Sequence, residues 1–114
     1  MVESAANKRV PTWDEMVGNV PEDWRDNFNE FYENNQWRHD HVDKYGWTLL
    51  MRYIGSSRLA AVWIVQYLLD NTAHDINLQD NCYGLTALSR AFAKDAQIEV
   101  LELLCRRGAK VLQR

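Results

Sequence analysis

The chain has 114 residues, of which 46% are hydrophobic and 25% are charged, and its formal net charge is −3. A chain of this length and composition forms one globular domain, which excludes a two-domain enzyme. The slightly acidic balance lacks the basic field that non-specific nucleic-acid binding requires, so nucleic acid is not an expected partner.

The sequence predicts neither a secretion signal nor a membrane span. Residues 1–10 have no apolar stretch behind a basic start and are expected to form a flexible N-terminal tail. The longest apolar run, residues 59–65, is far shorter than the roughly 20 residues that cross a bilayer. Cys82 and Cys105 are too few for the disulfide framework of a small secreted domain. We therefore expect a cytoplasmic, intracellular protein, although the sequence does not separate cytoplasm from nucleus.

Two helices are predicted in the first third of the chain, over residues 13–19 and 21–34. Thr12 is followed three residues later by Glu15, which is the spacing of a capping box at a helix start. Asn34-Asn35 is expected to end the second helix, because Asn tolerates a left-handed cap. The aromatic residues of that helix recur at i, i+4, i+7 and i+8 and so share one face: Trp24, Phe28, Phe31 and Tyr32.

Two later segments repeat one pattern, at residues 43–50 and 80–88. Both contain, in order, Asp, Tyr-Gly, any residue, Thr, any residue and Leu. Their glycines, Gly46 and Gly84, lie 38 residues apart and fit tight turns that need a positive φ. A recurrence at this distance is typical of a repeat protein.

Each copy of the pattern is followed by two apolar segments with a break between them. We therefore predict helix pairs at 48–55 with 58–70 and at 86–93 with 97–106. Gly55-Ser56-Ser57 is the expected break between the helices of the earlier pair. A threonine stands at the start of each pair, where its hydroxyl can cap the helix.

The repeated pattern resembles the ankyrin repeat, whose motif runs Asp-x-x-Gly-x-Thr-Pro-Leu-His before two short antiparallel helices. The Pro and His of that motif are absent from both copies. The resemblance covers residues 36–112 and, more weakly, residues 11–35. It is carried by the following residues: Asp43, Gly46, Thr48, Leu50, Gly84, Thr86, Leu88, Ala91 and Gly108.

This resemblance implies an all-α fold, namely an ankyrin-like solenoid of three helix-turn-helix pairs. The pairs would be joined by β-hairpin-like fingers at 36–47 and 73–85. A generic all-α bundle is the alternative fold. The expected single domain spans residues 11–114 and divides into these repeats: 11–42, 43–79 and 80–114.

The resemblance also implies a non-catalytic protein-protein interaction module with no cofactor and no metal. Such an adaptor or inhibitor would bind a partner protein through its fingers and concave helices. Trp47, between the Gly and Thr of the motif, is expected to project toward the partner, so that Trp47→Ala weakens binding and leaves the fold intact. Trp24 and Trp63 are expected to pack in the core. The residues expected to contact the partner are these: Trp37, Lys44, Tyr45, Trp47, Arg52, Asn81, Tyr83, Leu85 and Arg90.

A structural subunit is the alternative function. It would self-associate or join an assembly through an uncapped C-terminal end, where Val100, Leu103 and Val111 lack a covering repeat. The acidic, aromatic N-terminal helix is the other candidate for that docking.

A metal- or thiol-dependent enzyme is the third class considered. His39, His41, His74 and Cys82 suggest it, but their spacing matches neither a metal site nor a nucleophile motif. No catalytic residue and no metal ligand is therefore assigned.

Overall fold

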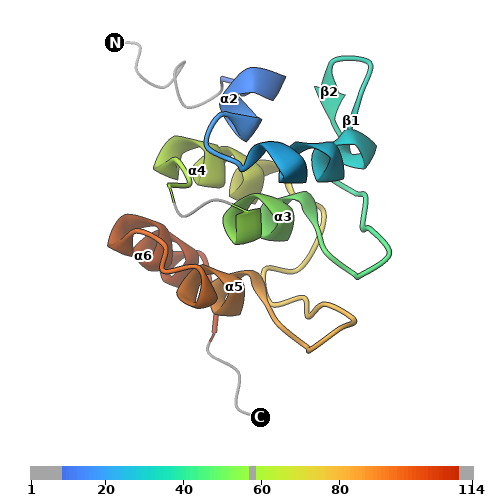
Figure 1. Cartoon of the computed structure of the whole chain (residues 1–114). Helices are drawn as coiled ribbons and strands as arrows, with labels where there is room; N and C mark the ends of the chain where they lie inside the picture. Colours follow the sequence, from blue (N-terminus) through green and yellow to red (C-terminus); the bar gives the residue numbers. More distant parts are fainter. Residues whose placement is uncertain (1–8, 57–58, 111–114) are drawn as a thin grey trace.

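A computed structural model describes residues 9–56 and 59–110 of the chain, so most of the predicted tail at 1–10 lies outside the described residues. The helices and strands, labelled in Figure 1, have the following bounds: α2 (Trp13–Val17), the 3-10 helix η1 (Glu22–Phe31), β1 (Tyr32–Glu33), β2 (Gln36–Trp37), α3 (Leu49–Ser56), α4 (Val62–Asn71), α5 (Ala87–Ala93) and α6 (Ile98–Arg106).

Helix α3 lies at the centre of this arrangement. It packs against η1, α4 and α5, and α6 packs against both α4 and α5. Figure 1 shows the pair α3 and α4 in a tier between η1 and the pair α5 and α6. The loops that precede α3 and α5 project to the same side of the molecule. The helix pairs predicted for the two later copies are therefore present. The main contact of α3 with the first third of the chain is made by η1.

Threonine side chains begin the helices as the sequence predicts. Thr12 Oγ1 accepts a hydrogen bond from the amide of Glu15, and the Glu15 carboxylate accepts one from the amide of Thr12, which confirms the capping box. Thr48 and Thr86 act in the same way at α3 and α5, where each Oγ1 accepts an amide N–H three residues on at 3.2 Å. These bonds satisfy donors that the first helical turn leaves without a partner.

The first third of the chain departs from the two predicted helices. The α-helix predicted over 21–34 is absent from this segment, which forms the 3-10 helix η1 and ends at Phe31. The segment is rich in Asp and Asn, which are poor α-helix formers. Asn34 and Asn35 form the two-residue loop of the β1–β2 hairpin, with φ values of 56° and 62°. Positive φ at both central residues is what a type I′ hairpin turn requires. The prediction of an all-α fold is therefore wrong in one respect, because β1 and β2 form a small two-stranded sheet.

The predicted break after α3 is also corrected. Helix α3 continues through Gly55 and Ser56, while Ser57 lies outside the described residues. Gly55 is buried against the guanidinium of Arg90, with which a Cβ at this position would collide. This glycine therefore provides space for a neighbouring side chain rather than a turn. Helix α4 begins at Val62, later than predicted.

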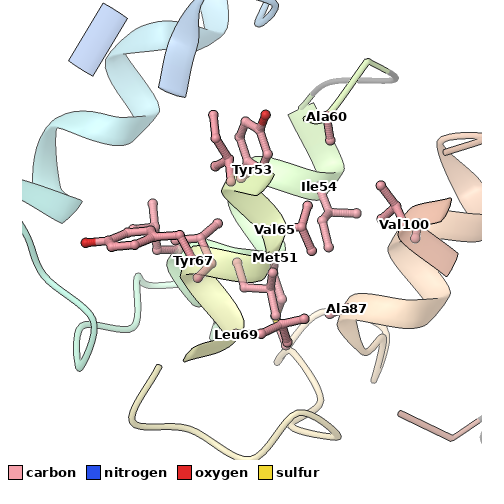
Figure 2. Packing of buried hydrophobic residues seen from close by; sticks show 14 of the residues in the cluster. Met51, Tyr53, Ile54, Ala60, Val65, Tyr67, Leu69, Ala87 and Val100 are labelled. Atoms are coloured by element: carbon pink, nitrogen blue, oxygen red, sulfur yellow. The ribbon is translucent and has the colours of Figure 1, made fainter. Parts of the chain in front are cut away.

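Buried apolar side chains fill the space between the helix pairs. Figure 2 shows Ile54 of α3 and Val65 of α4 close together, with Val100 of α6 facing them. All three side chains are fully buried, as are Phe28 and Phe31 of η1. Phe28 and Phe31 of the predicted aromatic face therefore pack inside the domain, while Trp24 and Tyr32 are only partly buried. None of the described helices is long and apolar enough to cross a membrane.

The predicted C-terminal docking surface does not form as expected. Val100 and Leu103 are 0% and 5% exposed because α6 turns them toward α4 and α5. Val111 lies outside the described residues. On the same helix pair, Phe92 and Ile98 are instead 58% and 60% exposed.

The tryptophans expected in the core behave differently from each other. Trp24 is partly buried and packs against the core, as expected. Trp63 is 38% exposed, so its predicted burial is wrong. Its neighbours Ile64 and Val65 take the inner side of α4, and the rotation of about 100° per residue leaves Trp63 outside. The guanidinium carbon of Arg9 lies 4.3 Å from its ring centroid.

Replacement of Leu68 tests the position of the core. Leu68 is 1% exposed, and we expect Leu68→Ala to lower the free energy of unfolding by about 2–5 kcal/mol. The same change at Leu59, which is 62% exposed, is the matched control and should cost less than about 0.5 kcal/mol. Urea denaturation measures both. A negligible loss for Leu68→Ala would place Leu68 at the surface.

Candidate functional site

The first finger is organised by the carboxylate of Asp43. Its Oδ1 accepts hydrogen bonds from the amides of Tyr45 and Trp47, both at 2.9 Å. Gly46 closes the turn with a φ of +79°, and a Cβ there would lie 2.9 Å from the side chain of Asn81 in the second finger. Only glycine combines this conformation with so close an approach. The predicted tight turn at Gly46 is thus confirmed.

The second finger uses Asp80 in the equivalent way. Its Oδ1 accepts the amides of Cys82, Tyr83 and Leu85 at 3.0–3.2 Å. Burial alone would raise the pKa of Asp80. The amides of Tyr83 and Leu85, the indole N–H of Trp47 and the amide of Cys82 outweigh it, so this pKa lies below the usual 3.8. Asp80 therefore carries a stabilised negative charge inside the finger.

Trp47 joins the two fingers. Its indole Nε1 donates a hydrogen bond of 2.9 Å to Oδ2 of Asp80. The guanidinium carbons of Arg52 and Arg90 lie 4.2 Å and 3.7 Å from the centroid of its ring, within the range of cation–π interaction. Trp47 is only partly exposed and connects the two fingers. The expectation that Trp47→Ala leaves the fold intact is revised for this reason.

Arg52 forms a buried ion pair beneath Trp47. Its Nη2 donates to Oδ2 of Asp43, and the two side chains are 5% and 1% exposed. The Nε of Arg52 is buried and has no hydrogen-bond partner within the described ranges. A pair of this kind fixes orientation more than it adds stability, since removing either charge would leave the other buried alone.

A hollow of about 470 Å³ adjoins these groups, and we call it the Trp47 hollow. Its volume is in the range of small-ligand and side-chain binding sites. Tyr83 and Tyr45 are its most exposed aromatic members, at 79% and 41%. The hollow is lined by residues of η1, both fingers and the inner helices: Trp24, Asn27, Tyr45, Trp47, Arg52, Cys82, Tyr83, Leu85 and Arg90.

The fold brings most of the expected contact residues to this hollow, where Tyr45, Trp47, Arg52, Tyr83, Leu85 and Arg90 line it. Two further ones lie beside it on the fingers. Lys44 places its Nζ 5.2 Å from the ring centroid of Tyr45, and Asn81 donates its amide to the carbonyl of Tyr45 at 2.8 Å. Arg52, although it lines the hollow, is buried rather than exposed.

Trp37 does not join this group, and its expected exposure is wrong. It is 6% exposed, and its Nε1 donates to the carbonyl of Pro11 at 2.8 Å. Its ring stacks on that of Trp13 with centroids 5.9 Å apart, and it also lies against Tyr32 at 4.3 Å. Residues 36 and 37 of the predicted finger form strand β2 instead of its projecting part, and from there Trp37 anchors the hairpin to the start of the domain.

The sequence did not identify Trp24, Asn27 and Cys82 as members of the hollow. Trp24 stands out only as the first residue of the aromatic series of η1, and its place opposite Trp47 follows from the packing of η1 against α3. Lys94 places its Nζ 5.6 Å from the Trp24 ring centroid. Nothing in the sequence around Asn27 or Cys82 indicates their position.

The histidines of the first finger have separate partners. His39 Nε2 lies 2.9 Å from the hydroxyl of Tyr67, and His41 Nε2 lies 2.5 Å from the carboxylate of Glu30. Burial lowers the pKa of His39, which favours its neutral form. Within residues 9–56 and 59–110, no group of three or more His, Cys, Asp or Glu side chains is placed to hold a metal ion.

Comparison with known proteins identifies a family. The family model described as ankyrin repeats (3 copies) matches residues 25–114. The matched range begins inside η1 and includes both fingers and the whole of the Trp47 hollow except Trp24. Searches of curated proteins and of solved structures found no match.

Because Trp47 connects the two fingers, its removal should lower the stability of the domain. Trp47→Ala removes the indole hydrogen bond and the ring that packs against two guanidinium groups. We expect a loss of about 3 kcal/mol in the free energy of unfolding. Tyr83→Ala, at a residue 79% exposed, is the matched aromatic control and should stay within about 0.5 kcal/mol. Equal effects in urea denaturation would contradict the role of Trp47.

The charge of Asp80 predicts a pH dependence. Its pKa is lower in the folded chain, so the stability it adds is complete above the unfolded value of 3.8 and is lost as the pH falls through the folded value. We expect Asp80→Asn to lower the free energy of unfolding by about 1–3 kcal/mol at pH 7. The difference between the variant and wild type should become smaller below about pH 4. Urea denaturation from pH 7 to pH 2 measures this difference, and a difference that does not change with pH would refute the stabilised charge.

Proposed function

The chain belongs to the ankyrin repeat family, and from this we propose that it is a non-catalytic module that binds another protein through its fingers and concave helices. In this proposal its helix pairs stack as a short solenoid, and it acts as an adaptor or inhibitor by occupying a surface of its partner. Ankyrin repeats are generally protein-protein interaction modules. The observation that carries the proposal for this chain is the Trp47 hollow.

The side chains around this hollow are of the types that dominate binding energy in interfaces. Tyr, Trp and Arg are enriched among hot-spot residues, which cluster in well-packed pockets. Tyr83 is 79% exposed, so most of its side chain is accessible to a partner. A partner that covers Tyr83 and Tyr45 would remove large apolar areas from water, which favours association.

The fingers are held together before any partner binds. The amide of Asn81 bonds to the carbonyl of Tyr45, and the indole of Trp47 bonds to Asp80. A surface that is already ordered avoids the entropy cost of ordering loops during binding. We therefore propose recognition by a rigid surface with little rearrangement of the fingers.

We propose that this binding takes place inside the cell. Cys82 and Cys105 are both exposed and unpaired. Exposed thiols without a disulfide framework fit a reducing compartment such as the cytoplasm.

Self-association is the second candidate function. Phe92 of α5 and Ile98 of α6 are 58% and 60% exposed on the last helix pair, which supports docking at that end of the chain. Mass in solution measured against concentration tests it. A molecular mass that stays at 13.4 kDa across the range would rule this candidate out.

A comparison of two surface variants tests the leading proposal. Wild type, Tyr83→Ala and Ile98→Ala are immobilised and exposed to lysate of the source cells, and the bound proteins are identified by mass spectrometry. We expect one stoichiometric partner on wild type and Ile98→Ala, with at least a tenfold lower recovery on Tyr83→Ala. Ile98 is the matched control, since it is 60% exposed and lies outside the hollow.

Other outcomes separate the candidates. A partner lost from Ile98→Ala and retained by Tyr83→Ala would contradict binding at the hollow and favour the last helix pair. Equal recovery by all three proteins would contradict both surfaces.

A further inference from the structure

The equivalent Asp and Arg residues of the two repeats make different contacts. In the earlier repeat, Asp43 pairs with Arg52, the arginine four residues after the threonine cap of α3. In the later repeat the corresponding residues are Asp80 and Arg90. Oδ1 of Asp80 is occupied by backbone amides, and Oδ2 accepts the indole of Trp47. The indole thus takes the oxygen that Arg90 would use by analogy with Arg52.

Arg90 is consequently held in place without an ion pair to any of the described residues. Its guanidinium lies 3.7 Å from the ring centroid of Trp47 and packs against Gly55. Its Nε donates to the carbonyl of Met51 at 3.4 Å. Within the described parts of the chain its terminal nitrogens have no hydrogen-bond partner. The guanidinium is therefore fixed between the Trp47 ring and Gly55, and no carboxylate of the described residues binds its terminal nitrogens.

Several charged groups lie around Arg90. Burial lowers the pKa of Arg90, Asp80 and Asp43 raise it, and Arg52 lowers it. A partly buried cation without a paired anion costs free energy, which an incoming anion would recover. Lys44 and Lys94, which lie over Tyr45 and Trp24 of the lining, add further positive charge.

A second observation points the same way. Arg52 lines the same hollow, and its buried Nε has no hydrogen-bond partner in the described residues. The acids nearest to these arginines, Asp43 and Asp80, have both carboxylate oxygens engaged. Among the described residues, therefore, neither Asp43 nor Asp80 has a free oxygen to accept a hydrogen bond from Arg90.

We propose that the Trp47 hollow binds an acidic segment of the partner protein, in which an Asp or Glu carboxylate pairs with Arg90. An aromatic or aliphatic side chain next to that acid packs on Tyr45, Tyr83 and Leu85. The planar guanidinium can bind a carboxylate through two parallel hydrogen bonds, which sets orientation as well as strength. This inference rests on the proposed function and narrows its partner to a carboxylate-bearing peptide.

Selection from random peptides tests the inference. Phage-displayed random 12-residue peptides are panned on the immobilised full chain, and enriched sequences are synthesised with a fluorescent label. We expect enrichment of Asp or Glu beside an aromatic or aliphatic residue. Fluorescence anisotropy should show binding at least tenfold weaker to Arg90→Gln and unchanged to Arg106→Gln. Arg106, on the exposed side of α6, is the matched control for the loss of one positive charge.

A change in the peptide keeps the test valid even where Arg90→Gln disturbs the fold. Replacing the acid of the peptide by its amide should weaken binding to the wild-type chain by the same factor. The two changes together should cost little more than either alone, because both remove one interaction.

The possible failures are distinguishable. Peptides that lack an acid but lose binding on Tyr83→Ala would overturn this inference and leave the proposed function standing. Acidic peptides that bind Arg90→Gln as tightly as wild type would overturn it as well. No enrichment, or binding insensitive to both Tyr83→Ala and Arg90→Gln, would overturn the inference and count against the hollow as the binding surface.

Discussion

The hydrogen bond from the Trp47 indole to Asp80 is the contact on which the candidate site depends. It joins residues 33 positions apart and so fixes one finger against the next. The same indole lies under the guanidinium groups of Arg52 and Arg90 and sets their positions. Because it also occupies an oxygen of Asp80, it leaves Arg90 without the ion pair that its counterpart Arg52 has. One side chain thus determines both the shape and the charge of the hollow.

Asp80 and Asp43 have the same structural role in the two fingers. Each carboxylate orders a finger by accepting hydrogen bonds from several backbone amides of that finger. Once the fingers are ordered, the exposed face of Tyr83 remains beside the hollow and is not needed for folding. In the proposed function, stability and recognition are carried by different residues of the same short segments, so mutation should separate them.

Spacing within the sequence predicted much of this arrangement. The caps at Thr12, Thr48 and Thr86, the turn at Gly46 and the later helix pairs follow from rules that relate residues a few positions apart. Most of the residues lining the hollow were also predicted, because the repeat pattern assigns the fingers to one side. The two-stranded hairpin was missed, since Asn34-Asn35 satisfies both a helix cap and a hairpin turn.

Contacts between distant residues could not be predicted in this way. Gly55 indicates a loop by its type, yet it makes room for Arg90 of the next helix pair. Trp37 is buried by a bond to Pro11, 26 positions earlier, and Trp63 is exposed because its neighbours face the core. A crystal structure of the chain with its partner tests the central claim most directly. We predict that Tyr83 is buried and that a partner carboxylate is hydrogen-bonded to Arg90. A partner seated on α4 and α6, with Tyr83 still exposed, would contradict the account.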